Sequence, residues 1–282
     1  MEHSQNNIAK VLMIVEGESL EPKFFEQLKK VFGIGVEIYM VGANIYRLYQ
    51  ELEKYEFNCD IKDILPDIGN HIEGIEELLS QRYAYTYLVF DFDAHHRERG
   101  EEGLDIDTIV SNNVEKLEKM AAYFVDETDP SIGRLYINYP MMESYRDASC
   151  FFDEGYRDNE ITIDDIGQYK SIAGKKRLAS INVKRYTREN FTDLTRMNVY
   201  KLYKICVGKW AAMTYEEYTS ASKADVILGC QAERVRRERI LDVINTSLFL
   251  VVDYFGNQKG FFDHVMTGEV PSKNDSEMVL LT

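Results

Sequence analysis

The stretch VLMIVEG, residues 11–17, decides the fold class of this chain of 282 residues. Five consecutive apolar side chains that end in Glu16 and Gly17 are typical of a strand buried on both faces of a parallel sheet. Pro22 follows at a position that helix starts tolerate, and residues 23–31 carry apolar side chains at helical spacing. A buried strand followed directly by a helix predicts an α/β fold.

The same alternation of strand and helix patterns continues to about residue 140. It predicts strands at 36–41, 85–90 and 135–138, and helices at 45–55 and 108–124. Helices between consecutive strands indicate parallel strands that are joined by right-handed crossovers. We therefore expect these strands to form one central, mostly parallel sheet of Rossmann-like form.

The strand patterns fade beyond residue 140, where apolar side chains recur at spacings of three and four. This periodicity predicts helices at 200–212, 215–222 and 232–255. We therefore expect two domains: an α/β domain at residues 1–145 and a mainly helical domain at residues 146–282.

Charge is distributed unevenly between these two parts. The formal net charge is −15, and a uniformly acidic surface would repel nucleic acid. However, residues 1–140 carry −14 of that total, whereas the segment 170–210 carries +9. The acidity is therefore regional, and it does not exclude a nucleic-acid-binding protein.

Aromatic side chains are interleaved with the cations of the basic segment 170–210, a pattern that suits phosphate contact combined with base stacking. Two alternatives remain open: a solvated helix face, or a docking surface for an acidic partner protein. The candidate nucleic-acid-binding residues are Lys175, Lys176, Arg177, Lys184, Arg185 and Arg188.

Several features bear on where the protein works. The four cysteines include no CxxC pair, residues 1–10 lack the apolar core of a signal peptide, and the aliphatic run 248–252 is too short to cross a bilayer. We therefore expect a reduced, cytoplasmic protein with no membrane association. A phosphate-binding loop is also missing, because no Ser or Thr follows Lys176 at the end of the only comparable glycine–lysine stretch.

Acidic side chains stand at the predicted carboxyl ends of the strands: Glu16 and Glu21, then Asp91 and Asp93, then Glu143. Loops at that edge of a parallel sheet border the ligand-binding crevice. Converging carboxylates repel one another unless protons or cations intervene, and oxygen ligands suit Mg²⁺ or Mn²⁺. The pattern predicts a site for one or two divalent ions.

Two histidines, His95 and His96, follow Asp93 directly. They could donate to a phosphate or join a metal site. The alternative, which we favour for both, is a pair of exposed loop histidines.

The acidic motifs resemble those of the TOPRIM fold, which is shared by bacterial primases, topoisomerases and a group of nucleases. Its signature is Glu-Gly after the first strand and Asp-x-Asp after the third, as in Glu16-Gly17 and Asp91-Phe92-Asp93 here. The longer stretch EGESLEPKFF, residues 16–25, is similar to the RloB-like and OLD-like branch, and so is the stretch NYP at 138–140 with Glu143 behind it. The resemblance covers roughly residues 10–145.

The resemblance implies a TOPRIM-like catalytic domain at residues 1–145. It implies that Asp91 and Asp93 hold one metal ion, that Glu16 acts as a ligand or general base, and that Glu21 and Glu143 support a second ion. The expected catalytic residues are accordingly Glu16, Asp91 and Asp93.

The implied function is a metal-dependent endonuclease or ribonuclease that cleaves DNA or RNA with Mg²⁺ or Mn²⁺. Relatives of this branch contain an ATPase domain or work beside one, commonly in bacterial defence against phage. Since this chain has no phosphate-binding loop, a separate ATPase partner is expected, and a homo-oligomer remains open.

Other functions remain as alternatives. The main one is a non-catalytic regulatory or assembly subunit of TOPRIM fold that binds nucleic acid or a partner protein. A phosphatase of the haloacid-dehalogenase type fits poorly, because its nucleophile should follow the first strand, which here ends in Glu16-Gly17. A primase or topoisomerase also fits poorly, since zinc-ligand spacing is missing and the chain is short.

Overall fold

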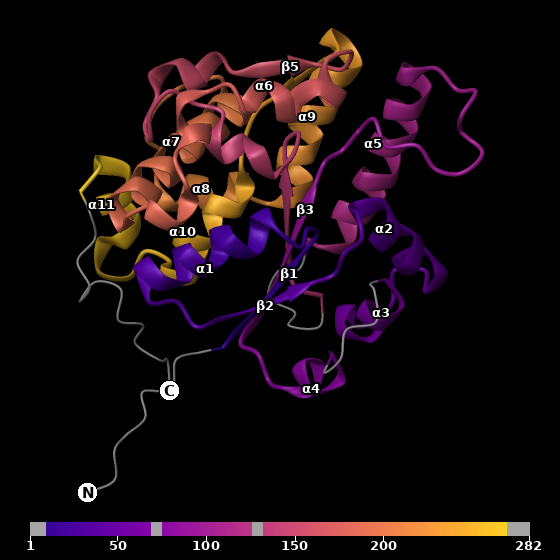
Figure 1. Cartoon of the computed structure of the whole chain (residues 1–282), viewed down its shortest axis with the longest axis horizontal. Helices are drawn as coiled ribbons and strands as arrows, with labels where there is room; N and C mark the ends of the chain where they lie inside the picture. Colours follow the sequence, from indigo (N-terminus) through magenta and orange to yellow (C-terminus); the bar gives the residue numbers. More distant parts are fainter. Residues whose placement is uncertain (1–9, 69–74, 126–131, 270–282) are drawn as a thin grey trace, which may run out of the picture.

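A four-stranded parallel sheet forms the centre of the protein (Figure 1). The computed structural model describes residues 10–68, 75–125 and 132–269. The strand order is β2–β1–β3–β4, with β1 at Val11–Val15, β2 at Val36–Met40, β3 at Tyr85–Asp91 and β4 at Arg134–Asn138. The predicted α/β fold with a parallel sheet is confirmed, and each predicted strand lies within one residue of its expected bounds.

The strand order places a topological switch point between β1 and β3. The chain crosses from β1 to β2 on one side of β1 and later returns to β3 on its other side. In open sheets of this kind, the crevice outside the carboxyl ends of the strands lies at that point. Val15 pairs with Val89, so the ends of β1 and β3 lie next to each other.

Helices cover both faces of the sheet. Helix α1 lies on the side of α7 and α10, whereas α2 and α3 lie on the opposite side (Figure 1). The helices of this half are α1 at Leu20–Phe32, α2 at Ile45–Lys54, α3 at Ile61–Ile68, α4 at Ile75–Ser80 and α5 at Ile106–Tyr123. Sequence periodicity predicted α1, α2 and α5 to within three residues, but it missed the short helices α3 and α4.

The remainder of the described chain is mainly helical, with many short 3-10 turns. No helix in the described ranges combines the length and apolarity needed to cross a membrane. The α-helices are α6 at Tyr169–Ala173, α7 at Arg188–Val207, α8 at Tyr215–Ala221, α9 at Ala224–Glu238, α10 at Leu250–Phe255 and α11 at Phe261–Thr267. The 3-10 turns are η1 at Met142–Arg146, η2 at Glu154–Asp158, η3 at Ile166–Gln168, η4 at Arg177–Ser180, η5 at Val183–Arg185, η6 at Thr246–Phe249 and η7 at Gln258–Gly260.

Two predicted helices were wrong in extent. The helix predicted at 200–212 is α7, which starts at Arg188 and ends at Val207, because the next residue, Gly208, has a φ of 80° that terminates it. The helix predicted at 232–255 is broken after Glu238, and Ile240–Asp242 instead forms β6, which pairs antiparallel with β5 at Glu160–Thr162. Aliphatic residues at 240–244 satisfy either pattern, and a strand partner 80 residues away decides between them.

Both halves of the chain contribute to one cluster of buried apolar side chains, which extends from Val11 to Met266. Polar contacts also fasten the second half to β4. The Ser247 hydroxyl donates to Asn138 Oδ1 at 2.9 Å, and the Thr246 hydroxyl donates to the Ile137 carbonyl at 2.9 Å. The division into domains at residue 145 stays a prediction.

Candidate functional site

Glu16 and Asp91 meet at the switch point because they end two neighbouring parallel strands. Asp91 is the last residue of β3, and Glu16 follows β1 directly. Glu16 Oε2 accepts a hydrogen bond from the Asp91 backbone N–H at 3.0 Å. The structure thus brings together the two carboxylates that the sequence places 75 residues apart.

Asp93 is held by a turn built on Phe92. The ring of Phe92 is fully buried and packs against Tyr139, with the ring centroids 5.1 Å apart. The Tyr46 hydroxyl donates to the Phe92 carbonyl at 2.8 Å, and the Asp93 N–H donates to the Pro140 carbonyl at 3.3 Å. Asp93 itself has a φ of 39°, a conformation that costs energy outside glycine and that concentrates at functional sites.

Glu21 lies in the first turn of α1 and folds back over Gly17. A Cβ atom at Gly17 would lie 2.5 Å from both carboxylate oxygens of Glu21. A larger residue at position 17 would therefore displace the Glu21 carboxylate, which gives the Glu-Gly pair a steric reason beyond the turn itself.

Glu143 lies in η1, the turn that follows β4, and its side chain is buried. Lys170 Nζ lies 3.1 Å from Glu143 Oε1, and Arg146 Nη2 lies 3.7 Å from the same oxygen. These two cations are the ones that reach the acidic cluster by an ion pair within the described ranges. Sequence analysis placed Lys170 in the basic segment but not at this site, because no sequence spacing links it to Glu143.

The electrostatics show that all five predicted carboxylates converge. Burial and repulsion from Glu16, Glu21, Asp93 and Glu143 hold the pKa of Asp91 well above its ordinary value. Burial likewise raises the pKa of Glu16 to about 8. The hydrogen bond from the Asp91 N–H acts to lower this pKa, whereas repulsion from Asp93 and Glu21 raises it further. Burial also raises the pKa of Asp93 and of Glu21. The surroundings therefore do not compensate the ionised cluster, and protons or cations must do so.

The chemistry of this donor set fits a hard divalent cation, which takes carboxylate oxygens as ligands. In the described part of the chain, no three His, Cys, Asp or Glu side chains are close enough to form a ready-made metal cage. Mg²⁺ does not require one, because it commonly keeps several waters and binds through one or two carboxylates plus substrate phosphates. Glu16, Asp91 and Asp93 are the side chains placed to do this.

Both histidines after Asp93 are half-buried, so the favoured expectation of exposed loop histidines was wrong. His95 Nδ1 lies 3.9 Å from Asp93 Oδ1. His96 stacks on Tyr46 with a centroid distance of 5.0 Å and an interplanar angle of 6°. Its ring nitrogen Nδ1 also lies 3.4 Å from the Asn44 side-chain amide. His95 therefore faces the acidic cluster, and His96 supports the turn from behind.

The six candidate nucleic-acid-binding residues divide into two groups. Lys176 Nζ pairs with Asp147 at 3.6 Å, and the Arg188 guanidinium lies 4.7 Å from the centroid of the Phe32 ring. The other side chains are exposed and have no ion pair with any residue that the structure describes: Lys175, Arg177, Lys184 and Arg185. This second group remains available to a phosphate backbone.

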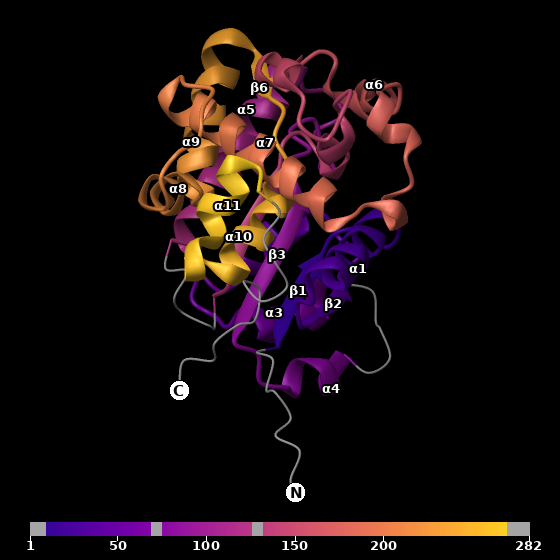
Figure 2. The same ribbon diagram turned by 90° about the vertical axis from the view of Figure 1, so that its left-hand side faces the viewer.

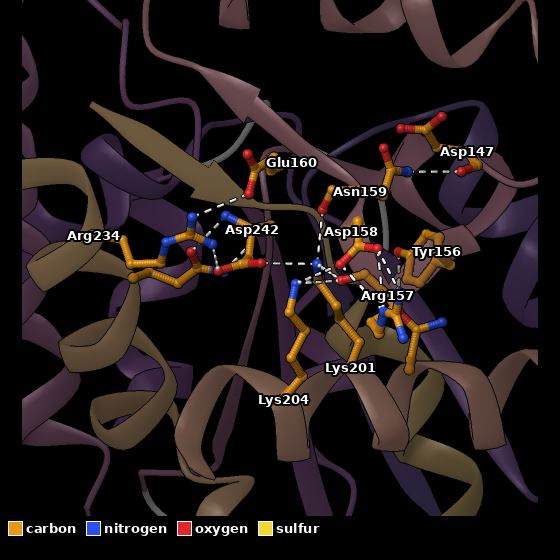
Figure 3. A network of polar contacts seen from close by, with 12 residues as sticks. Asp147, Tyr156, Arg157, Asp158, Asn159, Glu160, Lys201, Lys204, Arg234 and Asp242 are labelled. Atoms are coloured by element: carbon orange, nitrogen blue, oxygen red, sulfur yellow. Dashed lines mark hydrogen bonds and ion pairs between the residues drawn. The ribbon is translucent and has the colours of Figure 1, made fainter. Parts of the chain in front are cut away.

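Other members of the basic segment hold the fold together (Figure 3). Lys201 is fully buried, pairs with Asp242 at 2.8 Å, and donates to the Asn159 carbonyl at 2.8 Å. Lys204 donates to the Arg157 carbonyl at 2.6 Å. The interleaved aromatics Tyr169, Tyr186 and Phe191 are buried too, so they cannot stack on bases. The segment is therefore less accessible than its charge of +9 indicated.

A groove of about 570 Å³ lies between α1 and the turn η5. Figure 2 shows the chain after α6 descending beside α1. The Gln27 side chain joins the two walls by donating to the Tyr186 carbonyl at 2.7 Å. The groove begins at Pro22, the neighbour of Glu21, and its lining residues are Pro22, Lys23, Glu26, Gln27, Lys30 and Lys184.

The TOPRIM resemblance rests on the quoted motifs alone, since neither a family model, nor a curated protein, nor a solved structure matches this chain.

Proposed function

We propose that this protein is a metal-dependent nuclease that cleaves phosphodiester bonds in DNA or RNA with Mg²⁺ or Mn²⁺. One observation carries the proposal: the acidic cluster of Glu16, Glu21, Asp91, Asp93 and Glu143 converges at the topological switch point, and burial and mutual repulsion raise the pKa of Asp91 and Glu16 because cations do not match the ionised carboxylates. Buried carboxylates without matching cations are unfavourable unless a ligand neutralises them.

Each residue of the cluster has a place in this chemistry. Asp91 and Asp93 would hold one divalent ion, and Glu21 and Glu143 a second. A bound divalent ion supplies Lewis-acid polarisation of a phosphoryl oxygen and stabilises the charge that develops on the leaving oxygen. Glu16, next to Asp91, would act as a ligand or accept the proton of the attacking water.

Lys170 provides a positive charge beside Glu143 that would contact a phosphate bound at the acidic cluster. Hydrogen bonding to Glu143 raises the pKa of Lys170, so its ammonium stays charged. Its side chain is largely exposed beyond that contact, at 75% of its area. A phosphate that enters the cluster would meet this ammonium, which suits stabilisation of a phosphorane-like transition state.

The groove between α1 and η5 offers a path for the polymer away from the cluster. Lys23, Lys30 and Lys184 line it, and the exposed Arg185 is the neighbour of Lys184. Cations spaced along a groove that starts beside the carboxylates suit a phosphate backbone. Two of these lysines, Lys23 and Lys30, lie outside the segment 170–210 that sequence analysis assigned to nucleic acid.

Cleavage of plasmid DNA and of single-stranded RNA with Mn²⁺ or Mg²⁺ tests the catalytic proposal. We expect Asp91→Asn to lower the rate by at least about 100-fold, because it removes a negative ligand without changing size. Asp63→Asn on α3 is the matched control, since Asp63 is exposed on the far side of the sheet, and it should cleave like the wild type. Equal rates for Asp91→Asn and wild type would refute the assignment.

Fluorescence anisotropy with a labelled oligonucleotide tests the groove. Lys30→Glu combined with Lys184→Glu should weaken binding by at least tenfold and reduce its salt dependence, because fewer counterions are released. Arg82→Glu is the control, since Arg82 is exposed next to the amino end of β3, at the opposite edge of the sheet. An equal loss of binding free energy per reversed charge in the two proteins would mean that total charge, not the groove, governs binding.

The second candidate function is a non-catalytic regulatory or assembly subunit. The exposed cations Lys175, Arg177, Lys184 and Arg185, which would serve binding without catalysis, favour it. Calorimetric titration with Mn²⁺ separates the two, because a degenerate site would bind no ion in a manner that depends on Asp91. An ATPase partner in antiviral defence is part of the first proposal, and co-purification from the native host is its test.

A further inference from the structure

Two thiols lie in contact on neighbouring helices. Cys206, in the last turn of α7, and Cys230, in the middle of α9, have their Sγ atoms 3.8 Å apart. Both side chains are partly exposed, so small solutes reach them. The other two cysteines, Cys59 and Cys150, have no sulfur neighbour in the described part of the chain.

The hydroxyl of Tyr139 provides a second, independent observation at the same place. Its side chain is 1% exposed, and the hydroxyl has no hydrogen-bond partner among the described residues. Burial raises the pKa of Tyr139, and the nearby thiols of Cys230 and Cys206 raise it further, so this hydroxyl lies beside them. A buried donor without an acceptor is unfavourable, and a thiolate would supply the acceptor.

We propose that Cys206 and Cys230 form a redox-active dithiol, which a peroxide converts into an intramolecular disulfide between α7 and α9. The proposal is independent of the nuclease function. Bond formation requires the sulfur atoms to close from 3.8 Å to about 2.0 Å.

The reaction balances with one peroxide molecule. Contact between the two thiols lowers the pKa of Cys230 to about 7. Cys206 lies in the last turn of α7, where the helix C-terminus disfavours a negative charge, whereas Cys230 lies inside α9, so we assign Cys230 as the attacking thiolate. It attacks one peroxide oxygen, the O–O bond breaks, and hydroxide leaves and is protonated to water, which leaves a sulfenic acid on Cys230. Cys206 then attacks the Cys230 sulfur, the S–O bond breaks, and its thiol proton leaves with the hydroxide as a second water. The two thiols lose two electrons, and the peroxide gains them.

The position of the pair links it to the acidic cluster. Tyr139 packs against Phe92, whose neighbours are Asp91 and Asp93, and the next residue, Pro140, accepts the Asp93 N–H bond. The side chain of Tyr139 therefore connects the two thiols to the turn that positions the two aspartates.

Thiol counting on the full-length protein tests the proposal without any activity assay. The reduced, denatured chain should show four reactive thiols, and the chain treated with stoichiometric hydrogen peroxide should show two. Peptide mapping without reductant should find the peptides of Cys206 and Cys230 joined, and dithiothreitol should restore four thiols. Four remaining thiols, or a product joined through Cys59 or Cys150, would overturn the proposal.

Variants assign the roles. Cys59→Ser with Cys150→Ser should still form the disulfide at the wild-type rate. In Cys206→Ser we expect dimedone to trap a sulfenic acid on Cys230, whereas Cys230→Ser should react with peroxide at least tenfold more slowly at Cys206. Equal reactivity of the two single variants would overturn the assignment of Cys230 as the attacking thiol.

Discussion

Two of the buried groups of charged side chains in the described part of the chain are built in opposite ways. Around Lys201, each charge has a partner: its ammonium lies 2.8 Å from Asp242, and Arg234 pairs with the same carboxylate (Figure 3). At the acidic cluster, Asp91 is surrounded by four other carboxylates. We call the first the closed group, because its charges are paired with one another. We call the second the open group, because its carboxylates outnumber the cations beside them and a ligand could compensate them.

The pKa shifts express this difference. Burial acts against the ionised form of Asp242, but Lys201 and Arg234 outweigh it and lower the pKa of that carboxyl. At Asp91, burial and repulsion act in the same direction and raise the pKa. A paired group of charges specifies how segments join, while an unpaired group is retained at the cost of stability, which is the mark of a functional site.

Breaking the closed group should have the largest effect on stability. Lys201→Met leaves Asp242 buried beside only Arg234, so we expect a loss of about 3–5 kcal/mol in the free energy of unfolding. Thermal denaturation measures it, and Lys209→Met, at an exposed position of the same segment, is the control that should leave the midpoint unchanged. A loss below about 1 kcal/mol for Lys201→Met would show that the group is not structural.

At the open group, we expect the free energy of unfolding to fall as the pH rises. The pKa of Glu16 rises from 4.5 to about 8 on folding, so the native state binds more protons than the unfolded state between these values. Stability without metal should therefore be greatest near pH 5 and fall by about 1–2 kcal/mol on the way to pH 8, with partial exposure reducing the full effect. Burial lowers the pKa of Lys201 to about 8, so Lys201 is protonated over most of this window and begins to lose its proton only at the upper end.

Denaturation curves across this pH range, with and without Mn²⁺, provide the measurement. A bound cation takes the place of the proton, so saturating Mn²⁺ should abolish or reverse the slope. Glu16→Gln should flatten the slope without metal. A metal-free slope of the opposite sign would contradict the picture of an uncompensated cluster.

Relieving the repulsion should have the smallest effect and should stabilise. Asp91→Asn removes the repulsion that Asp91 exerts on Glu16 and Asp93 when the cluster is ionised. At pH 8 or above we therefore expect the metal-free protein to gain about 1 kcal/mol, a rise of a few degrees in the unfolding midpoint. The same change should eliminate the stabilisation by Mn²⁺. If Asp91→Asn destabilises the protein as Lys201→Met does, then the two groups are not different in kind.

The sequence predicts secondary structure most accurately where the pattern is local. The run at 11–15 and its counterparts at 36–40, 85–91 and 134–138 are strands because buried parallel strands need continuous apolar side chains. The convergence of Glu16, Asp91 and Glu143 followed from the rule that carboxyl ends of parallel strands share one edge. The helix prediction was wrong at 240–242, where strand pairing with 160–162 outweighed helical periodicity.

The sequence by itself determined the parallel sheet and the edge where five carboxylates gather, because strand direction and side-chain type are written locally. Only the tertiary structure decided which cations are free. Lys201 and Lys184 look alike in a run of basic residues. However, Lys201 is buried and paired with Asp242, whereas Lys184 is exposed in the groove beside α1. It also decided that Cys206 and Cys230, 24 residues apart, touch. The physical reason is that burial and pairing depend on contacts between distant segments, which no local pattern contains.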